Sequence, residues 1–220
     1  MEKGKTAIVI GATGLVGSHL LQQLLEDKYF DKVIVLSRRS TNIINEKLTE
    51  HIINFNEVNS YQHLVKGDVL FSCLGTTLKK AGTKDAQWKI DYTYQLEVAE
   101  SARKNGLSSM VLVSSSGASS KSRIFYSRMK GELEDAIREL SFPNYFIFQP
   151  SLLIGPREEV RRGEQWGEKI ANVLMKILPP IGKYKPIHGG EVSQAMINAY
   201  KQDKYSGEVV FVLDQIFELL

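Results

Sequence analysis

Residues 6–17 read Thr-Ala-Ile-Val-Ile-Gly-Ala-Thr-Gly-Leu-Val-Gly, an apolar run followed by glycines at positions 11, 14 and 17. The run predicts a buried strand, and the leucine-rich residues that follow predict a helix. Between them the chain must turn sharply, bring its backbone close to a ligand and pack the new helix against the sheet, and each task favours glycine. The free N–H groups at the start of such a helix bind phosphate. We therefore expect a dinucleotide-binding turn that includes Gly11, Gly14 and Gly17.

Beyond this turn, strand patterns alternate with helical patterns, which predicts a parallel sheet covered by helices on both faces. The expected fold is an α/β Rossmann fold with a doubly wound sheet. We expect one domain over residues 1–220, with a nucleotide-binding core at 1–150 and a small substrate-side lobe at 151–220. The expected strands are 6–10, 33–36, 51–55, 68–74, 109–114, 145–149 and 208–213, and the expected helices are 14–27, 58–64, 87–105, 126–140, 165–178 and 191–201.

The composition excludes several classes of protein. The 220 residues carry a net charge of +3, too small an excess for a nucleic-acid surface. No His or Cys cluster has the spacing of metal ligands, and no apolar run is long enough to cross a membrane. Cys73 is the only cysteine, so we expect a buried thiol in a reducing compartment. These features led us to expect a cytoplasmic protein.

A pair of arginines, Arg38 and Arg39, follows the second expected strand. Proteins that prefer NAD usually carry an acidic residue here for the ribose hydroxyls, whereas arginine suits the 2′-phosphate of NADP. The next carboxylate in the sequence is Glu46. The pair therefore predicts NADP(H) as the cofactor, and an ordinary solvent-exposed loop is the alternative.

Hydroxyl and amino side chains gather at the end of the fifth expected strand and the start of the next helix. Ser114, Ser115 and Ser116 end the strand, at the carboxyl edge where doubly wound folds bind ligands. Tyr126 and Lys130 are four residues apart, so they project from one face of a helix. Reduction of a carbonyl by hydride needs a proton donor, and a tyrosine beside an ammonium group can serve. We expect catalysis by Tyr126 and Lys130 with one of the three serines, of which we favour Ser115.

Together these motifs resemble the atypical branch of the short-chain dehydrogenase/reductase superfamily, and more closely its Tat-interacting-protein-like oxidoreductases. The matching stretches follow one another in order along most of the chain, and the Cys-Leu-Gly-Thr-Thr stretch is fairly specific. They are Gly11–Gly17, Ser37-Arg38-Arg39, Cys73-Leu-Gly-Thr-Thr77, Lys80-Ala-Gly82, Ser114-Ser115, Tyr126-x-x-x-Lys130-Gly-Glu132 and Pro150-Ser-Leu-Leu153.

The resemblance implies an NADPH-binding Rossmann fold and oxidoreductase activity. It assigns cofactor contacts to the glycine turn, the arginine pair, the loop after the fourth strand and the Tyr–Lys pair, and Leu153 and Arg161 match later contact positions less closely. Carried over position by position, the main contacts are Thr13, Gly14, Leu15, Val16, Arg38, Arg39, Leu74, Gly75, Tyr126 and Lys130.

The sequence departs from the superfamily pattern at two positions. Aspartate often ends the third strand to meet the adenine amine; this chain has Asn54 there, whose carbonyl still accepts that bond. Arginine often precedes Pro150, where this chain has Gln149, so an acidic group on a substrate loses one partner. Asp91 is expected to be a packing or surface residue.

Three hypotheses of function follow. The first is an NADPH-dependent oxidoreductase that acts on a small carbonyl or alcohol through Ser115, Tyr126 and Lys130. The second is an NADPH-binding regulator or sensor with little turnover, and the third is a nucleotide-sugar epimerase, although such enzymes generally carry a larger substrate lobe. The expected partner is a small molecule, with no nucleic acid and no membrane span, and the chain is expected to be a monomer or homodimer. Residues 156–167 are expected to form a flap over the cofactor, with an ordinary surface loop as the alternative, and His188 is expected to be a solvated loop residue.

Overall fold

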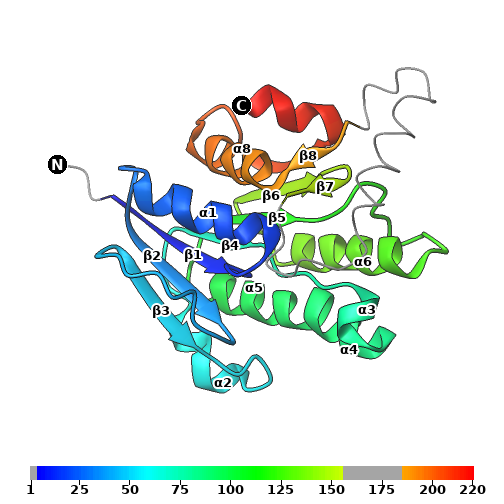
Figure 1. Ribbon diagram of the computed structural model, residues 1–220, viewed down its shortest axis with the longest axis horizontal. Helices are drawn as coiled ribbons and strands as arrows, with labels where there is room; N and C mark the ends of the chain where they lie inside the picture. Colours follow the sequence, from blue (N-terminus) through cyan, green and yellow to red (C-terminus); the bar gives the residue numbers. More distant parts are fainter. Residues whose placement is uncertain (1–3, 156–184) are drawn as a thin grey trace.

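The computed structural model describes residues 4–155 and 185–220. At its centre is a seven-stranded sheet in the order β3-β2-β1-β4-β5-β6-β9, in which every neighbouring pair of strands is parallel (Figure 1). The chain builds one half of the sheet outward from β1 and then returns to build the other half from β4, so the order reverses between these two strands. The expected Rossmann fold is confirmed.

The elements alternate along the chain as expected for a doubly wound sheet. The strands are β1 (Lys5–Ile10), β2 (Phe30–Ser37), β3 (Leu48–Ile52), β4 (Val69–Ser72), β5 (Ser109–Val113), β6 (Asn144–Gln149), β7 (Leu153–Ile154), β8 (Ile187–His188) and β9 (Gly207–Val212). The helices are α1 (Leu15–Glu26), α2 (Val58–Tyr61), α3 (Leu78–Ala81), α4 (Lys84–Trp88), α5 (Tyr94–Lys104), α6 (Phe125–Glu139) and α8 (Gly189–Lys201), with helical turns η1 (Gln62–Leu64), η2 (Lys89–Thr93) and η4 (Leu213–Leu219).

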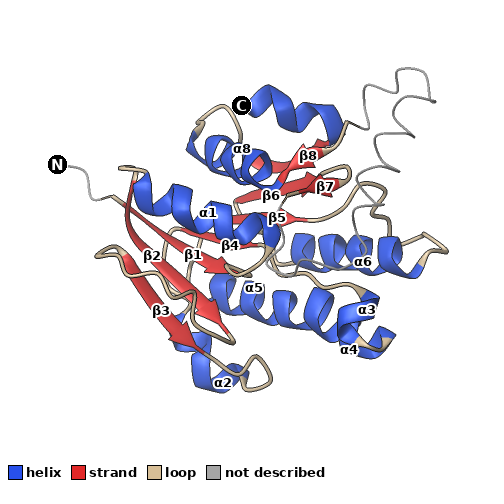
Figure 2. Ribbon diagram, in the orientation of Figure 1, coloured by secondary structure: helices blue, strands red, loops and turns tan. Residues whose placement is uncertain are grey.

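The residues of β1 alternate between two hydrophobic cores because successive side chains of a strand point to opposite faces. Ala7 and Val9 pack in the core with α1 and α8, whereas Ile8 and Ile10 pack in the core with α5 and α6. Figure 2 shows the two helix layers on either side of the strands. Because both faces of the sheet are covered, a ligand reaches it at the strand ends, and the carboxyl ends hold the candidate site.

The long helix expected over 87–105 is interrupted. α4 ends at Trp88, η2 is a π-helical turn, and α5 begins at Tyr94. A π-turn adds a residue to the helical ladder, and such turns occur frequently at functional sites. Asp91 lies in this turn and is fully buried. The periodicity of the sequence missed the turn because the apolar spacing stays helical on both sides of it.

The third strand also differs from the expectation, since β3 spans Leu48–Ile52 and not 51–55. Phe55, which the expected strand contained, is buried from the turn after β3 and stacks on Tyr94 with ring centroids 5.3 Å apart. The apolar pattern therefore identified Phe55 correctly as a core residue, but the predicted bounds of the third strand were wrong.

The described part of the expected C-terminal lobe returns to the main fold. β9 pairs with β6 at the edge of the sheet, and α8 packs against α1. β8 pairs with β7 in a separate two-stranded sheet. The helix expected over 165–178, the flap expected over 156–167 and Arg161 lie outside the described residues.

Candidate active site

The glycine turn joins β1 to α1 at the point where the strand order reverses. Gly11 has a φ of +82°, a left-handed conformation that favours glycine. A Cβ atom on Gly11 would lie 2.4 Å from the backbone carbonyl carbon of Cys73, and one on Gly17 would lie 2.1 Å from the carbonyl oxygen of Gly11. Neither position has room for a side chain. The turn is therefore packed, backbone against backbone, on the loop that follows β4.

The start of α1 has the features of an anion site. Its N-cap, Gly14, makes no side-chain hydrogen bond, whereas the hydroxyls of Thr77 and Thr83 cap α3 and α4. The first turn of α1 also contains no acidic side chain. The first N–H groups of the helix are thus left for an external acceptor, which fits the pyrophosphate of a dinucleotide.

The residues expected to contact the cofactor in this turn differ in exposure. Thr13 and Gly14 are exposed, and Leu15 is half-buried. Val16 is 5% exposed, with its side chain in the core with α1. A ligand at this turn would therefore reach the backbone of Val16 and not its side chain.

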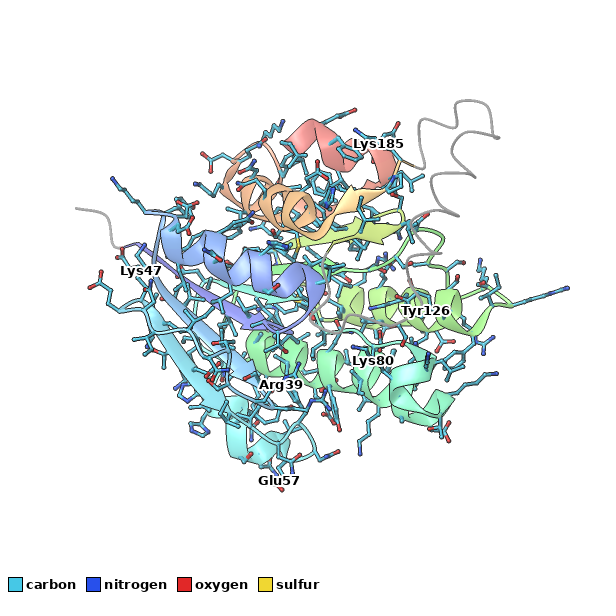
Figure 3. The ribbon with its side chains drawn as sticks, in the orientation of Figure 1. Arg39, Lys47, Glu57, Lys80, Tyr126 and Lys185 are labelled. Carbon is cyan, nitrogen blue, oxygen red and sulfur yellow. The ribbon has the colours of Figure 1, made fainter. Side chains whose placement is uncertain are left out.

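Arg38 and Arg39 are both exposed where the chain leaves β2. Figure 3 labels Arg39. The Ser37 hydroxyl donates a hydrogen bond to the carbonyl oxygen of Arg39 at 2.7 Å, which turns the backbone at the strand end. Sequence reasoning missed a carboxylate beside this pair. Glu50 of β3 accepts hydrogen bonds from Ser40 and Thr41, the residues that directly follow the arginines. This contact depends on the pairing of β2 with β3, which the spacing of residues in the sequence does not predict.

Asn54 lies in the turn after β3 and bonds to its own neighbours. Its Oδ1 accepts hydrogen bonds from the backbone N–H and the side-chain amide of Asn56, at 3.1 and 3.0 Å, and its Nδ2 donates to Glu57 at 2.7 Å. These two bonds use both lone pairs of the amide oxygen. The contact expected between this oxygen and adenine stays a prediction, and it would require Asn56 to move away.

The loop after β4 is tied to β1 and carries two of the expected cofactor contacts. The Cys73 N–H donates to the carbonyl oxygen of Ile10 at 2.9 Å. Leu74 is half-buried and Gly75 is exposed. Burial raises the pKa of the Cys73 thiol to about 12, even though the charge of Lys130 acts in the opposite direction. The thiol is therefore protonated and unreactive at neutral pH.

A cavity of about 460 Å³ opens where β5 and β6 end. Ser115, Tyr126 and Leu153, three of the residues predicted from the sequence, line it together. Figure 3 labels Tyr126. Its volume suits a small molecule. Tyr126 is 38% exposed, so its ring borders both the cavity and solvent. The other lining residues are Ser114, Ser116, Pro150, Ser151 and Leu152.

The three serines after β5 have different partners. Ser114 is 5% exposed, and its hydroxyl donates to the carboxylate of Glu134. Ser115 is half-buried, and its hydroxyl makes one long contact, 3.5 Å, with the carbonyl oxygen of Ser116. Because the Ser114 hydroxyl is already engaged, Ser115 and Ser116 remain as candidates to bind a substrate oxygen.

Lys130 lies one turn after Tyr126 on α6 but is buried. It is 2% exposed, and its Nζ lies 3.6 Å from Oδ1 of Asp91. The other oxygen of Asp91 accepts a hydrogen bond from the Thr76 N–H at 2.9 Å. Burial raises the pKa of Asp91 above its ordinary value, and Lys130 offsets only part of this effect. Asp91, to which sequence reasoning gave no role, thus connects Lys130 to the loop after β4.

A second buried carboxylate, Glu134, lies one turn further along α6. It accepts hydrogen bonds from Ser114 and from the Gln149 amide, whose Nε2 lies 3.0 and 3.1 Å from the two carboxylate oxygens. Burial raises the pKa of Glu134, and these hydrogen bonds offset part of the rise. Gln149 therefore bonds to the protein interior and not to the cavity.

The start of α8 packs on the start of α1. A Cβ atom on Gly189 would lie 2.6 Å from the carbonyl oxygen of Leu15. His188, just before the helix, is exposed, and its N–H donates to Glu191 at 2.8 Å. The residues around His188 are therefore fixed against the glycine turn.

Within residues 4–155 and 185–220, no group of His, Cys, Asp and Glu side chains is arranged to hold a metal ion. Nor do these residues contain a helix of the length and apolar character needed to cross a membrane.

The chain is similar to known proteins over most of its length. The sequence model of the NAD dependent epimerase/dehydratase family matches residues 7–193. Protein FMP52, mitochondrial, of Candida glabrata is 38% identical over 205 residues, which make up 90% of this chain and 86% of the relative. Protein HTATIP2 of Rattus norvegicus is 34% identical over 176 residues, which make up 78% of this chain and 72% of the relative.

A solved structure shows the same fold. The Bordetella bronchiseptica enzyme WbmH, in complex with NAD⁺, superimposes with a TM-score of 0.72 at 16% sequence identity. The match covers 96% of this chain and 76% of WbmH. At this identity the likeness concerns the fold alone.

The cytoplasmic location expected from the sequence is contradicted by these comparisons. The Candida glabrata relative is named as a mitochondrial protein, and so are further relatives between 33% and 40% identical. The expectation rested on a single cysteine and a short first apolar run. These features argue for a reducing compartment, but they do not distinguish one reducing compartment from another.

The resemblance to Tat-interacting-protein-like oxidoreductases is confirmed by the rat relative, and the described fold agrees with it. The chain belongs to the NAD dependent epimerase/dehydratase family.

Proposed function

We propose that the protein is an NADPH-dependent oxidoreductase that acts on a small carbonyl or alcohol. The observation that carries the proposal is that Ser115 and Tyr126 line one cavity at the carboxyl edge of the sheet. The glycine turn lies at the same edge, at the end of β1. A small substrate in the cavity would therefore be near both a hydroxyl donor and the end of the dinucleotide.

The glycine turn and the arginine pair would hold the cofactor. The N–H groups at the start of α1 would bind its pyrophosphate, and Arg38 and Arg39 would bind the 2′-phosphate that distinguishes NADPH from NADH. The family is NAD dependent, and WbmH was solved with NAD⁺, which supports a nicotinamide dinucleotide here. When bound, such a cofactor supplies or accepts a hydride.

The side chains of the cavity would handle the proton and the substrate oxygen. When a carbonyl carbon gains a hydride, its oxygen becomes an alkoxide and needs a proton, which the Tyr126 hydroxyl would donate. The Ser115 hydroxyl would hold this oxygen in place. Because Tyr126 is 38% exposed, water can return the proton to its oxygen after each turnover. Lys130, one turn away, would keep a positive charge behind the tyrosine.

The proposal is tested by Tyr126→Phe, which removes the proton donor and keeps the ring. We expect turnover of a carbonyl substrate to fall by about 100-fold or more, and the Kd for NADPH to stay within about twofold. Substrates would be found by screening carbonyl compounds and following NADPH absorbance. Tyr29→Phe is the matched control, because Tyr29 is 37% exposed and lies outside the cavity. Unchanged turnover in Tyr126→Phe would remove the mechanism.

The family match favours a second candidate, an epimerase of nucleotide sugars. In an epimerase the hydride returns to the substrate, so the sugar changes configuration without net consumption of the dinucleotide. The same screen, extended to nucleotide sugars with product analysis by NMR, separates the two activities. Binding of NADPH without turnover of either substrate class would favour the sensor hypothesis instead.

A further inference from the structure

The backbone that carries Arg38 and Arg39 is fixed at both of its ends. We call residues 37–42 the arginine turn. At its start, the Ser37 hydroxyl donates to the Arg39 carbonyl oxygen at 2.7 Å. At its end, the Asn42 N–H donates to the Ser40 hydroxyl oxygen at 3.0 Å, and Asn42 adopts a φ of +58°. These two local hydrogen bonds restrict the backbone of an otherwise exposed turn.

One carboxylate from the neighbouring strand joins the end of the arginine turn to the sheet. Oε2 of Glu50 accepts a hydrogen bond from the Ser40 hydroxyl at 2.6 Å, and Oε1 accepts one from the Thr41 N–H at 2.8 Å. Glu50 is paired with Val35 in the β2–β3 register, so its own backbone is fixed by the sheet. Burial raises the pKa of Glu50, but the hydrogen bonds outweigh it and hold the pKa below its ordinary value. The group is therefore a carboxylate at neutral pH.

A carboxylate at this place has two opposing consequences. Its negative charge is bound to Ser40 and Thr41, the residues directly after the arginine pair, and would disfavour a phosphate at the pair by Coulomb repulsion, an effect that solvent weakens at an exposed site. Its two hydrogen bonds fix the backbone from which both guanidinium groups extend. A fixed backbone reduces the conformational entropy that long arginine side chains lose when they bind a phosphate. Substitution of Glu50 therefore measures which of the two effects on NADPH affinity is larger, repulsion of the phosphate or positioning of the arginine turn.

We infer that Glu50 is a specificity-determining positioning residue that holds the arginine turn in the conformation that binds the 2′-phosphate of NADPH. The inference rests on the proposed use of NADPH. Glu50 acts through Ser40 and Thr41, so its role concerns the difference between NADPH and NADH and not the binding of the shared part of the dinucleotide.

The test compares Glu50→Ala and Glu50→Gln by titration calorimetry with NADPH and with NADH. Glu50→Ala removes both acceptors, and we expect it to weaken NADPH binding by about tenfold while the Kd for NADH stays within about twofold. Glu50→Gln keeps one carbonyl acceptor for the Thr41 N–H, so we expect a loss of about threefold. Glu46→Ala is the control, since it removes an exposed carboxylate from the same loop region and is expected to change neither Kd.

A second variant changes the other partner of the same contact, Ser40 of the arginine turn. Ser40→Ala removes the hydroxyl that donates to Glu50 and accepts from the Asn42 N–H, and it leaves the carboxylate in place, so any loss it causes comes from positioning and not from charge. We expect Ser40→Ala to weaken NADPH by about threefold, with NADH unchanged. Adenosine 2′,5′-bisphosphate, compared with adenosine 5′-monophosphate, isolates the contribution of the 2′-phosphate without the nicotinamide half, and circular dichroism shows whether each variant is folded. If Glu50→Ala does not fold, Glu50→Gln and Ser40→Ala carry the test.

Three results would overturn the inference. Tighter NADPH binding in Glu50→Ala and Glu50→Gln alike would show that repulsion dominates. Equal losses for NADPH and NADH would show a general structural role. A wild-type preference for NADPH that all variants retain would show that the turn needs no support from Glu50. Equal Kd values for NADPH and NADH in the wild type would instead overturn the cofactor assignment of the proposed function, and the inference with it.

Discussion

The glycine turn and the inner face of α6 lie at the same edge of the sheet, but they are stabilised in different ways. The glycine turn consists of backbone packed on backbone, with no charged group and no room for a Cβ atom at Gly11 or Gly17. The inner face of α6 instead carries Lys130 and Glu134, which are 2% and 6% exposed and depend on partners from other elements. The turn is therefore sensitive to side-chain volume, and α6 to charge and protonation.

This difference affects how each region responds to change. The glycine turn contains no titratable side chain, so the effect of a steric clash there on stability should not depend on pH. A buried ion pair such as Asp91–Lys130 fails when one member is removed, because the other is left as an uncompensated charge.

The largest effect is expected for Asp91→Ala. It removes the partner of the Lys130 ammonium and the acceptor of the Thr76 N–H together, and we expect the free energy of unfolding to fall by about 4 kcal/mol. Asp91→Asn should cost less, because its amide oxygen can still accept from Thr76. Denaturant titration measures both variants, with the exposed Asp203→Ala as a control within about 0.5 kcal/mol of wild type. A loss in Asp91→Ala no larger than in the control would show that the ion pair does not stabilise α6.

The next effect is expected for Gly17→Ala. The added Cβ would lie 2.1 Å from the carbonyl oxygen of Gly11, so the turn must shift, and we expect a loss of about 3 kcal/mol together with loss of NADPH binding. Gly190→Ala is the matched control. A Cβ there meets its nearest atom at 3.6 Å, so stability should stay within about 1 kcal/mol of wild type. Gly17→Ala should show the same loss at every pH. A pH-dependent loss would contradict the purely steric account of the turn.

The smallest effect is expected for Glu134→Gln, and it depends on pH. The raised pKa of Glu134 means that the folded protein binds more protons than the unfolded chain above the ordinary glutamate value of 4.5. The wild-type free energy of unfolding should therefore fall as the pH rises from this value through the raised pKa of the folded state. At acid pH the free energy of unfolding of Glu134→Gln should lie within about 1 kcal/mol of the wild-type value. As the pH rises, the variant should not show the decrease in stability that ionisation of Glu134 causes in the wild type.

Thermal unfolding at a series of pH values measures the slope for wild type and Glu134→Gln. Glu139→Gln, an exposed glutamate on the same helix, should keep the wild-type slope. If Glu134→Gln also kept the wild-type slope, the buried carboxylate would not be the group that titrates.

The same contrast explains what sequence reasoning could find. The glycine turn is a local pattern, so residues 6–17 alone predicted the turn and its position after a strand. The same residues also indicated the Rossmann fold of the chain. The serines and Tyr126 were placed at one edge by the rule that parallel strands end together, and Ser115 and Tyr126 do line one cavity.

The partners of these residues could not be read in the same way. Asp91 and Lys130 are 39 positions apart, and Asp91 is aligned by a π-turn that leaves no periodic signal. Glu50 contacts the arginine turn only because β2 and β3 pair in one register. Gln149, which stands where the superfamily often has arginine, bonds to Glu134 in the interior. Each of these contacts is set by packing between distant elements, which one sequence does not reveal.

The small sheet of β7 and β8 has a consequence for how the protein can evolve. Leu153 pairs with Ile187 and Ile154 with His188, so two segments that are far apart in the sequence are hydrogen-bonded side by side. When the ends of an insertion are fastened together, each doubling of its length costs only about 0.6 kcal/mol of closure entropy. Evolution can therefore change the number of residues between Ile154 and Ile187 at a small entropic cost, provided that the pairing of β7 with β8 is kept.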